Sequence, residues 1–413
     1  MPFRPDDPTP AAGVSRRRFL KETGIGAAAL AVMRPELVRG SAANSTITLG
    51  IIGCGGRGRW IADLFRKHGG YTVAAAADYF PQRADELGDK HGVPAARRFS
   101  GLSGYRRLLE QPLDAVAIET PPYFHPAQAR EAVEAGRHVY LAKPVAVDVP
   151  GCTTVEQSAA RATARKLCFL VDFQTRANEL FVEAVGRVHR GAVGQLAFGE
   201  ATYHAEDPFL EQAKFARSDA PEDRLRSWGL SRELSGDIIA EQNIHTLDVV
   251  SWVMGKPPVR AYGTGGRKYR DVGTCWDTFS VVFHYPSDVG VTFSSRQFQG
   301  HGTRPEGIRT RIFGSEGVLE AEYGGQVLIR GSQFYRGGET STIYEQGAVS
   351  NIATFHDAIT RGDHTNQTVG ESVRSNLMAI LGRTAAYRGQ VVTWEELMGS
   401  DERLEPDLKG LKD

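Results

Sequence analysis

Ionisable side chains occur at two places in this sequence where acid–base chemistry could be carried out. Lys143 comes at the end of an apolar run that is typical of a strand, directly before a proline. Farther along the chain, Glu241, His245 and Asp248 follow one another at spacings of four and three residues. A helix that begins near Asp237 would therefore carry all three on one face. Lysine and histidine with pKa values near neutrality can give or take a proton, so these residues suit proton transfer at an alcohol oxygen.

A glycine-rich segment has the spacing of a dinucleotide-binding loop. The apolar run 47–52 leads into Gly53-Cys54-Gly55-Gly56-Arg57-Gly58, and helical spacing of apolar residues follows. The first glycine of such a loop allows a tight turn, the second lets the backbone approach a pyrophosphate, and the third lets the helix pack on the strand. Phosphates are stabilised at the positive end of the helix. Because the motif stands between a predicted strand and a predicted helix, it indicates a bound dinucleotide.

The second predicted strand, residues 71–77, ends at an acidic residue. Asp78 comes twenty residues after Gly58, where a carboxylate receives the ribose hydroxyls of a dinucleotide. Tyr79 follows it, and no arginine or lysine is adjacent in the sequence to hold a 2′-phosphate. The sequence therefore predicts NAD, not NADP, as the cofactor.

Two further predicted strands, residues 115–118 and 138–141, complete the pattern of a parallel sheet with intervening helices. In such sheets the ligand crevice is lined by the loops at the carboxyl ends of the strands. The residues expected beside the cofactor for this reason are Thr120, Pro121, His125 and Lys143.

Together these motifs resemble those of the Gfo/Idh/MocA family of oxidoreductases, from about residue 46 to the end of the sequence. Residues 135–144 are similar to the family sequence AGxHVxxEKP, except that Ala142 stands where the family has glutamate, and Pro122 replaces an asparagine. The family pattern Asp-x-Gly-x-His-x-x-Asp is also matched in part. Here Glu241 replaces the first aspartate and Asn243 replaces the glycine.

The resemblance implies roles that spacing alone does not. His245 would be the general base, Lys143 would hold the substrate hydroxyl and stabilise oxyanion character, and Glu241 would bind a neighbouring hydroxyl. The usual substrates of this family would make the substrate a sugar, glycoside or polyol. Further candidates for contact with the substrate are Arg176, Asp248, His204 and Trp228.

The pattern of elements predicts two folded domains after a leading segment. Residues 46–171 are expected to form an α/β Rossmann domain with a doubly wound parallel sheet. Beyond about residue 172 long alternating strands prevail, so residues 172–413 are expected to form an α+β domain with an open, mostly antiparallel sheet. By resemblance, this second domain would bind the substrate and join the chains of a homo-oligomer through the flat face of its sheet.

Residues 1–45 differ from the rest of the sequence. The run Ser-Arg-Arg-Arg-Phe-Leu-Lys at 15–21 contains Arg16 and Arg17, and is followed by a mildly apolar run at 25–32 and small residues at 40–43. This order is typical of a twin-arginine export signal. It predicts a periplasmic enzyme exported in folded form with NAD already bound and tightly retained; a disordered basic arm is the alternative.

Composition excludes several other classes of protein. The 49 basic and 49 acidic residues balance, and no basic stripe follows the leading segment, so nucleic acid is not an expected partner. The four cysteines have no zinc-site spacing, and no apolar run is long enough to span a bilayer. Glu241 and His245 could hold a metal ion, but no third ligand is evident, so no metal is expected.

Three functions remain open from the sequence. The first is an NAD-dependent dehydrogenase of a sugar, glycoside or polyol. The second is a glycosidase of the same fold that retains NAD and works by oxidation, elimination, addition and reduction. The third, a non-catalytic NAD-bound sensor, is disfavoured by the presence of both Lys143 and His245.

Overall fold

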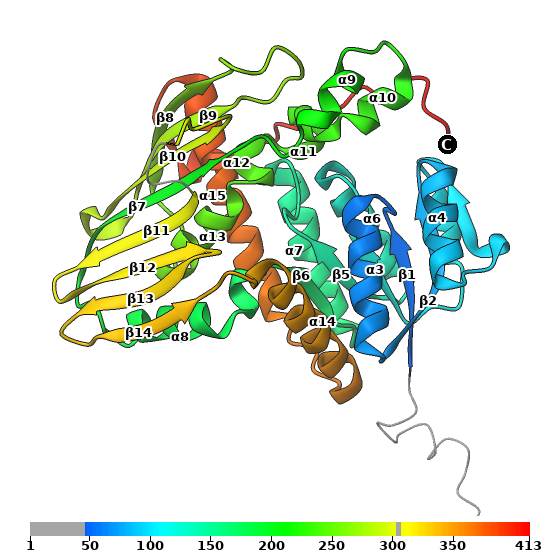
Figure 1. Ribbon diagram of the computed structural model, residues 1–413, viewed down its shortest axis with the longest axis horizontal. Helices are drawn as coiled ribbons and strands as arrows, with labels where there is room; N and C mark the ends of the chain where they lie inside the picture. Colours follow the sequence, from blue (N-terminus) through cyan, green and yellow to red (C-terminus); the bar gives the residue numbers. More distant parts are fainter. Residues whose placement is uncertain (1–45, 303–306) are drawn as a thin grey trace, which may run out of the picture. The chain divides into compact units, whose positions relative to one another are not determined.

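The structure is a computed structural model that describes residues 46–302 and 307–413. Its first sheet has six parallel strands (Figure 1). In spatial order β3-β2-β1-β4-β5-β6 they are Arg98–Ser100, Tyr71–Asp78, Ile47–Ile52, Ala115–Ile118, His138–Ala142 and Phe169–Asp172. The order reverses between β1 and β4, where loops from neighbouring strands part and leave a crevice for a ligand. The predicted doubly wound parallel sheet is confirmed.

Helices cover both faces of this sheet, and for this reason its strands are apolar on both sides. On one face pack α3 (Gly56–His68), α4 (Pro81–His91) and α14 (Ile343–Arg361). On the other face pack α5 (Gly104–Leu109), α6 (His125–Glu134) and α7 (Val149–Ala164). Helix α14 belongs to the second half of the chain, and its Ile352 and Phe355 pack against the first sheet.

The second sheet has nine strands in the order β14-β13-β12-β11-β7-β10-β9-β8-β15. Its paired strands are antiparallel except for β7 and β10, so the predicted mostly antiparallel sheet is confirmed. In chain order the strands β7–β15 are Leu196–Ala205, Arg260–Gly266, Thr278–His284, Gly290–Gln297, Gly307–Gly314, Gly317–Tyr323, Gln326–Gly331, Tyr335–Glu339 and Val392–Thr393.

One face of the second sheet packs on helices, and in the part of the chain that the structure describes the other face carries exposed side chains such as Phe198, Tyr262 and Val282. Helices α8 (Glu179–His189), α13 (Ile244–Met254) and α15 (Gln367–Arg388) contact the covered face. Burial alternates along β9 and β10, as expected when one face of an antiparallel sheet is packed. The segment 314–317 joins β11 to β12 as a hairpin turn.

Short helices connect β7 to α13 and lie beside the last part of the chain (Figure 1). They are α9 (Ala213–Ala216), α10 (Pro221–Arg226), α11 (Arg232–Ser235) and α12 (Ile238–Glu241). Arg224 of α10 donates hydrogen bonds to the backbone oxygens of Asp407 and Lys409.

Within residues 46–302 and 307–413, no helix is both long and apolar enough to cross a bilayer. The predicted twin-arginine signal, with Arg16 and Arg17, lies outside the described residues.

Candidate active site

The glycine-rich loop has the geometry that a pyrophosphate requires. Gly53 has a φ of +93°, and a Cβ there would lie 2.7 Å from the backbone of Glu119. A Cβ on Gly58 would collide with the carbonyl oxygen of Gly53, which explains the close packing of α3 on β1. By contrast, a Cβ on Gly56 would meet nothing within 4 Å. The loop is therefore tight where the protein packs and open at the N-terminus of α3, where phosphate oxygens would be stabilised.

Asp78 is held at the end of β2 by the backbone around it. Its carboxylate accepts hydrogen bonds from the amides of Cys54 (2.8 Å) and Phe80 (2.9 Å). Burial raises the pKa of Asp78, while these hydrogen bonds and Arg83 oppose the rise. The carboxylate lines a pocket together with Gly53, Gly55 and other residues of the glycine-rich loop. It therefore has the place and the hydrogen-bonding capacity to accept ribose hydroxyls.

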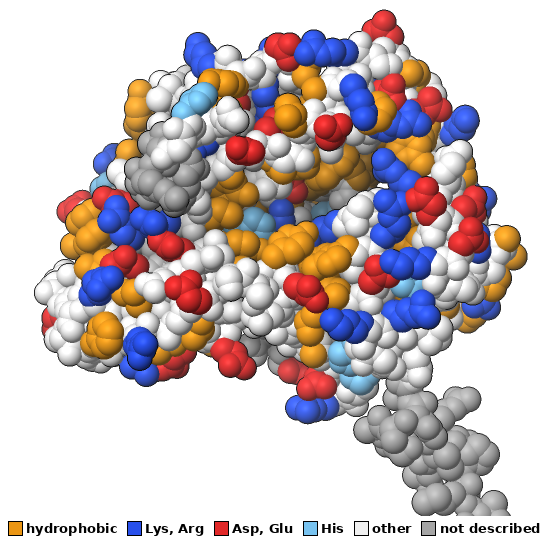
Figure 2. Space-filling view, in the orientation of Figure 1, with side chains coloured by type: hydrophobic (Ala, Val, Ile, Leu, Met, Phe, Trp, Pro, Cys, Tyr) orange, Lys and Arg blue, Asp and Glu red, His pale blue; other side chains and the backbone are white. Residues whose placement is uncertain are grey.

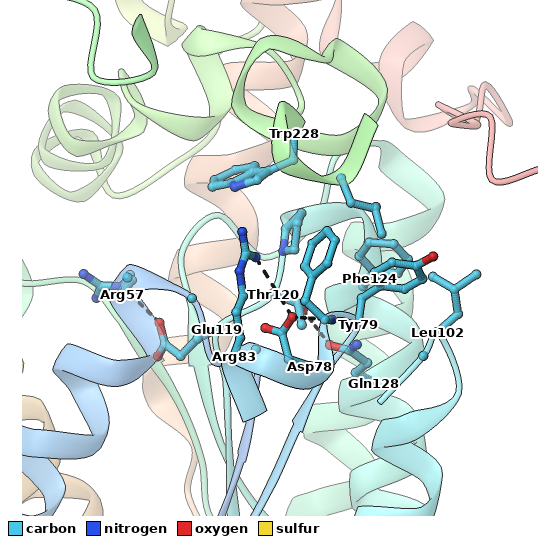
Figure 3. Close-up of a pocket in the computed structure, with 17 residues that line it drawn as sticks. Arg57, Asp78, Tyr79, Arg83, Leu102, Glu119, Thr120, Phe124, Gln128 and Trp228 are labelled. Atoms are coloured by element: carbon cyan, nitrogen blue, oxygen red, sulfur yellow. Dashed lines mark hydrogen bonds and ion pairs between the residues drawn. The ribbon is translucent and has the colours of Figure 1, made fainter. Parts of the chain in front are cut away.

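The structure corrects one part of the argument for NAD over NADP. No cation is adjacent to Asp78 in the sequence, but Arg83 lines the same pocket and its Nη1 lies 4.0 Å from the carboxylate (Figure 3). The first turn of α4 brings this arginine back toward the end of β2, which a search of sequence neighbours does not detect. Asp78 itself, not the absence of a cation, is the feature of this site that favours NAD.

The remaining wall of this pocket comes from β4, α6 and the second half of the chain (Figure 3). The hydroxyl of Thr120 donates to Gln128 Oε1 at 2.6 Å, which orients the loop after β4. Trp228, a predicted contact of the substrate, lines this pocket together with Asp78. The open glycine loop, the exposed helix N-terminus and the carboxylate at the ribose position together fit a dinucleotide.

Lys143 and Glu241 meet in the structure although they belong to different elements. The Nζ of Lys143 donates to the backbone oxygen of Glu241 at 2.6 Å and lies 3.2 Å from its Oε1. Both side chains are buried. Two of the predicted site residues, one after β5 and one at the end of α12, thus lie in direct contact.

The helix expected from near Asp237 through Asp248 is broken in two. Helix α12 ends at Glu241 and α13 begins at Ile244. In a continuous helix the Glu241 carbonyl would accept from the amide four residues later, but the His245 amide faces the Gln242 oxygen at 3.4 Å. The freed Glu241 carbonyl accepts the hydrogen bond from Lys143.

His245 is buried at the start of α13, next to the ring of Tyr323, with ring centroids 5.1 Å apart. Its Nδ1 has no hydrogen-bond partner in the described part of the chain. Burial lowers the pKa of His245 well below its usual value, and the positive charges of Lys143 and Arg57 lower it further. The imidazole is therefore neutral at neutral pH and can accept a proton.

The charge of Lys143 is set by opposing effects. Burial lowers its pKa, and the carboxylate of Glu241 raises it in opposition. Asp172 also acts to raise it, and Asp172 stands opposite Ala142 in the pairing of β5 with β6. The family has a glutamate at the position of Ala142, and in this chain the carboxylate of Asp172 on the neighbouring strand lies beside that position.

Sequence reasoning missed a buried charged group around Arg57. The Nε of Arg57 lies 3.0 Å from Glu119 Oε2, and its guanidinium also pairs with Asp172. Asn351 of α14 donates to Asp172 at 2.7 Å. Burial raises the pKa of Glu119 to about 7, against the effect of Arg57. Glu119 and Asp172 each stand at the carboxyl end of a strand, β4 or β6, which was the available signal.

Arg176 and Asp248 bind each other. Their closest atoms are 2.9 Å apart, and Asp248 also accepts from Ser375 at 2.7 Å. Arg176 also pairs with Glu371 of α15. These bonds join α13 to α15, and the predicted contacts of Arg176 and Asp248 with a substrate stay predictions.

The other predicted site residues have partners in loops and strands. Each ring nitrogen of His125 lies 2.8 Å from a carbonyl oxygen, of Thr120 or of Pro144, so this histidine links the loops after β4 and β5. His204 Nε2 lies 3.1 Å from the hydroxyl of Ser294. Among the described residues no cluster of three or more histidine, cysteine or acidic side chains could hold a metal ion.

The surface is hollowed between the two sheets, with basic and histidine side chains visible inside the hollow (Figure 2). Arg57 of the glycine-rich loop lines the pocket of Asp78, and its charge and that of Lys143 both act on the buried His245, so the cofactor pocket and the predicted acid–base residues are close enough to interact. A dinucleotide and a small polar molecule would meet there, at the carboxyl ends of the parallel strands.

Two family models match the chain. Residues 47–170 match the oxidoreductase family model for an NAD-binding Rossmann fold, and residues 181–320 match the GFO/IDH/MocA C-terminal domain. Together they cover well over half of the chain.

Similar proteins include a glycosyl hydrolase family 109 protein of Shewanella pealeana, 28% identical over 212 residues, which are 46% of each chain. The match therefore spans less than half the length of that relative. An inositol 2-dehydrogenase of Rhizobium meliloti is 24% identical over 284 residues, 67% of this chain and 76% of that protein.

A solved structure with the same fold is a scyllo-inositol dehydrogenase of Lactobacillus casei with bound NAD(H) and scyllo-inositol. The TM-score is 0.67 at 20% identity, over 85% of this chain and 99% of that one. A levoglucosan dehydrogenase in complex with NADH and levoglucosan also has a TM-score of 0.67, at 17% identity, over 84% and 99% of the two chains.

Proposed function

Because the chain belongs to the Gfo/Idh/MocA family of oxidoreductases and contains its NAD-binding domain, we propose that it oxidises a hydroxyl group of a sugar, glycoside or polyol. The observation that carries the proposal is the direct contact of Lys143 with Glu241, beside a neutral buried His245. The names of the inositol and levoglucosan dehydrogenases support this class of substrate.

The chain's own residues supply binding and proton transfer. NAD, when bound, supplies the acceptor for the hydride of the carbinol carbon. His245 takes the hydroxyl proton, which its low pKa and neutral state allow. The ammonium group of Lys143 donates a hydrogen bond to the same substrate oxygen and stabilises the negative charge that develops there. Glu241 raises the pKa of Lys143 against the effect of burial, which favours the ammonium form, and its carboxylate accepts a hydrogen bond from an adjacent hydroxyl. In the reverse direction His245 returns the proton.

A glycosidase that retains NAD is the second candidate. The match to a glycosyl hydrolase family 109 protein favours it, and the same acid–base residues would serve it. A redox-neutral reaction would also suit an enzyme that works where NAD is not supplied. A non-catalytic sensor would have no use for a buried lysine and histidine in one site.

One experiment separates these functions. The purified protein is incubated with NAD and a panel of glycosides, inositols and anhydrosugars, and both NADH absorbance and aglycone release are recorded. NADH formation without cleavage supports the dehydrogenase, and cleavage without net NADH supports the glycosidase. If neither signal exceeds that of the His245→Ala variant, the proposal of an enzyme acting on these substrates is wrong.

We also propose that the protein is exported to the periplasm by the twin-arginine route with NAD bound. The residue order at 15–43 supports this. Changing Arg16 and Arg17 to lysine should leave folded, active enzyme in the cytoplasm. Normal periplasmic amounts of this variant would contradict the proposal.

A further inference from the structure

The pocket that contains Asp78 has an outer wall supplied from outside the first sheet. Leu225 and Trp228 line it, and both belong to residues 221–235, called here the cap. Figure 3 shows Trp228 extending from the cap over the space above Asp78 and Arg83. Because Asp78 marks the ribose position, the space between them is where the adenosine half of a dinucleotide would lie.

Apolar and cation–π contacts hold the cap on the first sheet. Phe80, Leu225 and Leu234 form a small buried cluster of their own, separate from the two main cores. The ring of Phe80 has the guanidinium of Arg83 and that of Arg226 each 4.5 Å from its centroid. Side chains packed around this cluster come from five separate stretches of the sequence: Tyr79, Leu102, Tyr123, Phe124, Trp228 and Leu411.

A second segment, residues 404–412, called here the strap, ties the cap to the same loops. The Leu102 amide donates to the Lys412 oxygen at 3.0 Å, and the Lys412 amide donates to the Tyr79 hydroxyl at 3.1 Å. Tyr123 donates to Glu405 at 3.1 Å.

The strap is also fastened to the cap and to α7. The guanidinium of Arg224, in the cap, donates to the backbone oxygens of Asp407 (2.8 Å) and Lys409 (3.2 Å). At the other end of the strap, the Leu404 amide donates to Asp148 Oδ2 at 3.0 Å. Most of these bonds use backbone groups of the strap, so its position depends on its backbone more than on its side chains.

We propose that the cap and the strap enclose the adenosine half of NAD, with Trp228 against the adenine ring, and that NAD leaves only when they separate from the first sheet. Neither segment belongs to the glycine motif or to the predicted cofactor residues. The two loops that the strap holds, around Tyr79 and Leu102, themselves line the pocket. The inference rests on NAD binding alone and holds for either proposed reaction.

The enclosure predicts how NAD exchanges. A segment that must open before the cofactor passes slows both association and dissociation, whereas a stacking contact mainly slows dissociation. Release of the cofactor after each turnover would therefore be slow in either proposed reaction.

The test measures the association and dissociation rates of NADH by stopped-flow fluorescence on the whole protein. Trp228→Ala should raise the dissociation rate about 10- to 100-fold, as expected for loss of a base–aromatic stack. Leu411→Asp, which places a charge in the apolar cluster, should raise both rates about 10-fold or more. The matched control is Leu210→Asp, because Leu210 is 69% exposed and lies outside the cluster.

Unchanged dissociation in Trp228→Ala together with unchanged association in Leu411→Asp would overturn the proposal. If Leu411→Asp does not fold, hydrogen exchange in the unaltered protein decides the role of the strap. NAD should slow exchange at residues 221–235 and 404–412 as well as in the glycine-rich loop. Protection confined to the glycine-rich loop would overturn the enclosure even if Trp228 contributes a stacking contact.

Discussion

At the scale of single residues, Asp78 is the predicted contact for the ribose hydroxyls, and the backbone amides that it binds complicate its replacement. Its carboxylate satisfies the amides of Cys54 and Phe80, so alanine would leave two donors without a partner. Asn removes the charge and keeps one acceptor oxygen, but the two amides bind different oxygens of the carboxylate, so one of them would face the Asn amide group.

We expect Asp78→Asn to weaken NAD binding about 10- to 100-fold, because hydrogen bonds to a charged group contribute roughly 1.5–3 kcal/mol. Binding is measured by isothermal titration calorimetry. With the carboxylate gone, Arg83 faces the ribose without its partner, so the preference for NAD over NADP should also fall. Asp85→Asn, at an exposed position, is the control. NAD affinity equal to that of the parent would remove Asp78 from the site.

The raised pKa of Glu119 predicts how the stability of the folded protein changes with pH. Its pKa is raised by burial from 4.5 to about 7, so between these pH values the folded protein holds a proton that the unfolded chain releases. Stability contributed at this residue is therefore present below pH 4.5 and is lost as pH rises toward 7.

Urea unfolding of the NAD-free protein tests this. Between pH 4.5 and 7.5 the parent should lose roughly 3 kcal/mol more than Glu119→Gln, which has no proton to release. Glu110→Gln, at an exposed position, controls for the change of a glutamate to an amide. Parallel pH dependences of parent and Glu119→Gln would show that Arg57 keeps Glu119 ionised throughout.

At the scale of elements, the acid–base site depends on two segments that meet only in the folded protein. The end of β5 supplies Lys143, and the break between α12 and α13 supplies the Glu241 carbonyl and His245. A continuous helix would use that carbonyl internally. The interruption is thus what lets Lys143 bind there.

Lys143 and His245 should behave as one unit. Alanine at either position should lower turnover about 10²- to 10⁴-fold, and the double variant should be little worse than the poorer single variant. NAD binding, measured separately, should persist because the glycine-rich loop and Asp78 are unchanged. A single variant that keeps more than about a third of parental turnover would make that residue structural. A loss of NAD binding would instead identify it as a cofactor contact.

At the scale of the whole molecule, the open face of the second sheet is a candidate surface for association of chains. Phe198 stacks on Phe313 across neighbouring strands, with centroids 4.3 Å apart, and Phe198 is 44% exposed. Tyr262 and Val282 are paired in β8 and β9 and are also exposed. Apolar residues on an uncovered sheet face favour contact with another such face.

We expect Phe198→Glu combined with Val282→Glu to reduce the molecular mass in sedimentation experiments from that of an oligomer to that of one chain. The charges would have to be buried without partners in a sheet-to-sheet interface. Val182→Glu, which changes an exposed valine of α8 instead, should leave the mass unaltered. A parent that already sediments as a single chain would refute the predicted oligomer.

The sequence by itself determined the features that depend on neighbours along the chain. The strand, glycine turn and helix at 47–65 follow from local backbone requirements, and so does the acid at the end of β2. The change from strands with intervening helices to long alternating strands likewise predicted both sheets. These patterns repeat over a few residues and leave few alternatives for the backbone.

Only the tertiary structure decided which side chains share a site. Arg57 pairs with Glu119 and Asp172, residues far apart in sequence that parallel strands place at one edge. Trp228 lines the pocket at Asp78, although its sequence neighbours indicated nothing about a nucleotide. The backbone oxygen of Glu241 at the end of α12 accepts a hydrogen bond from Lys143, which is about a hundred residues away in the sequence. In each case the arrangement depends on a contact between residues that are distant in the sequence, and no local sequence pattern indicates such a contact.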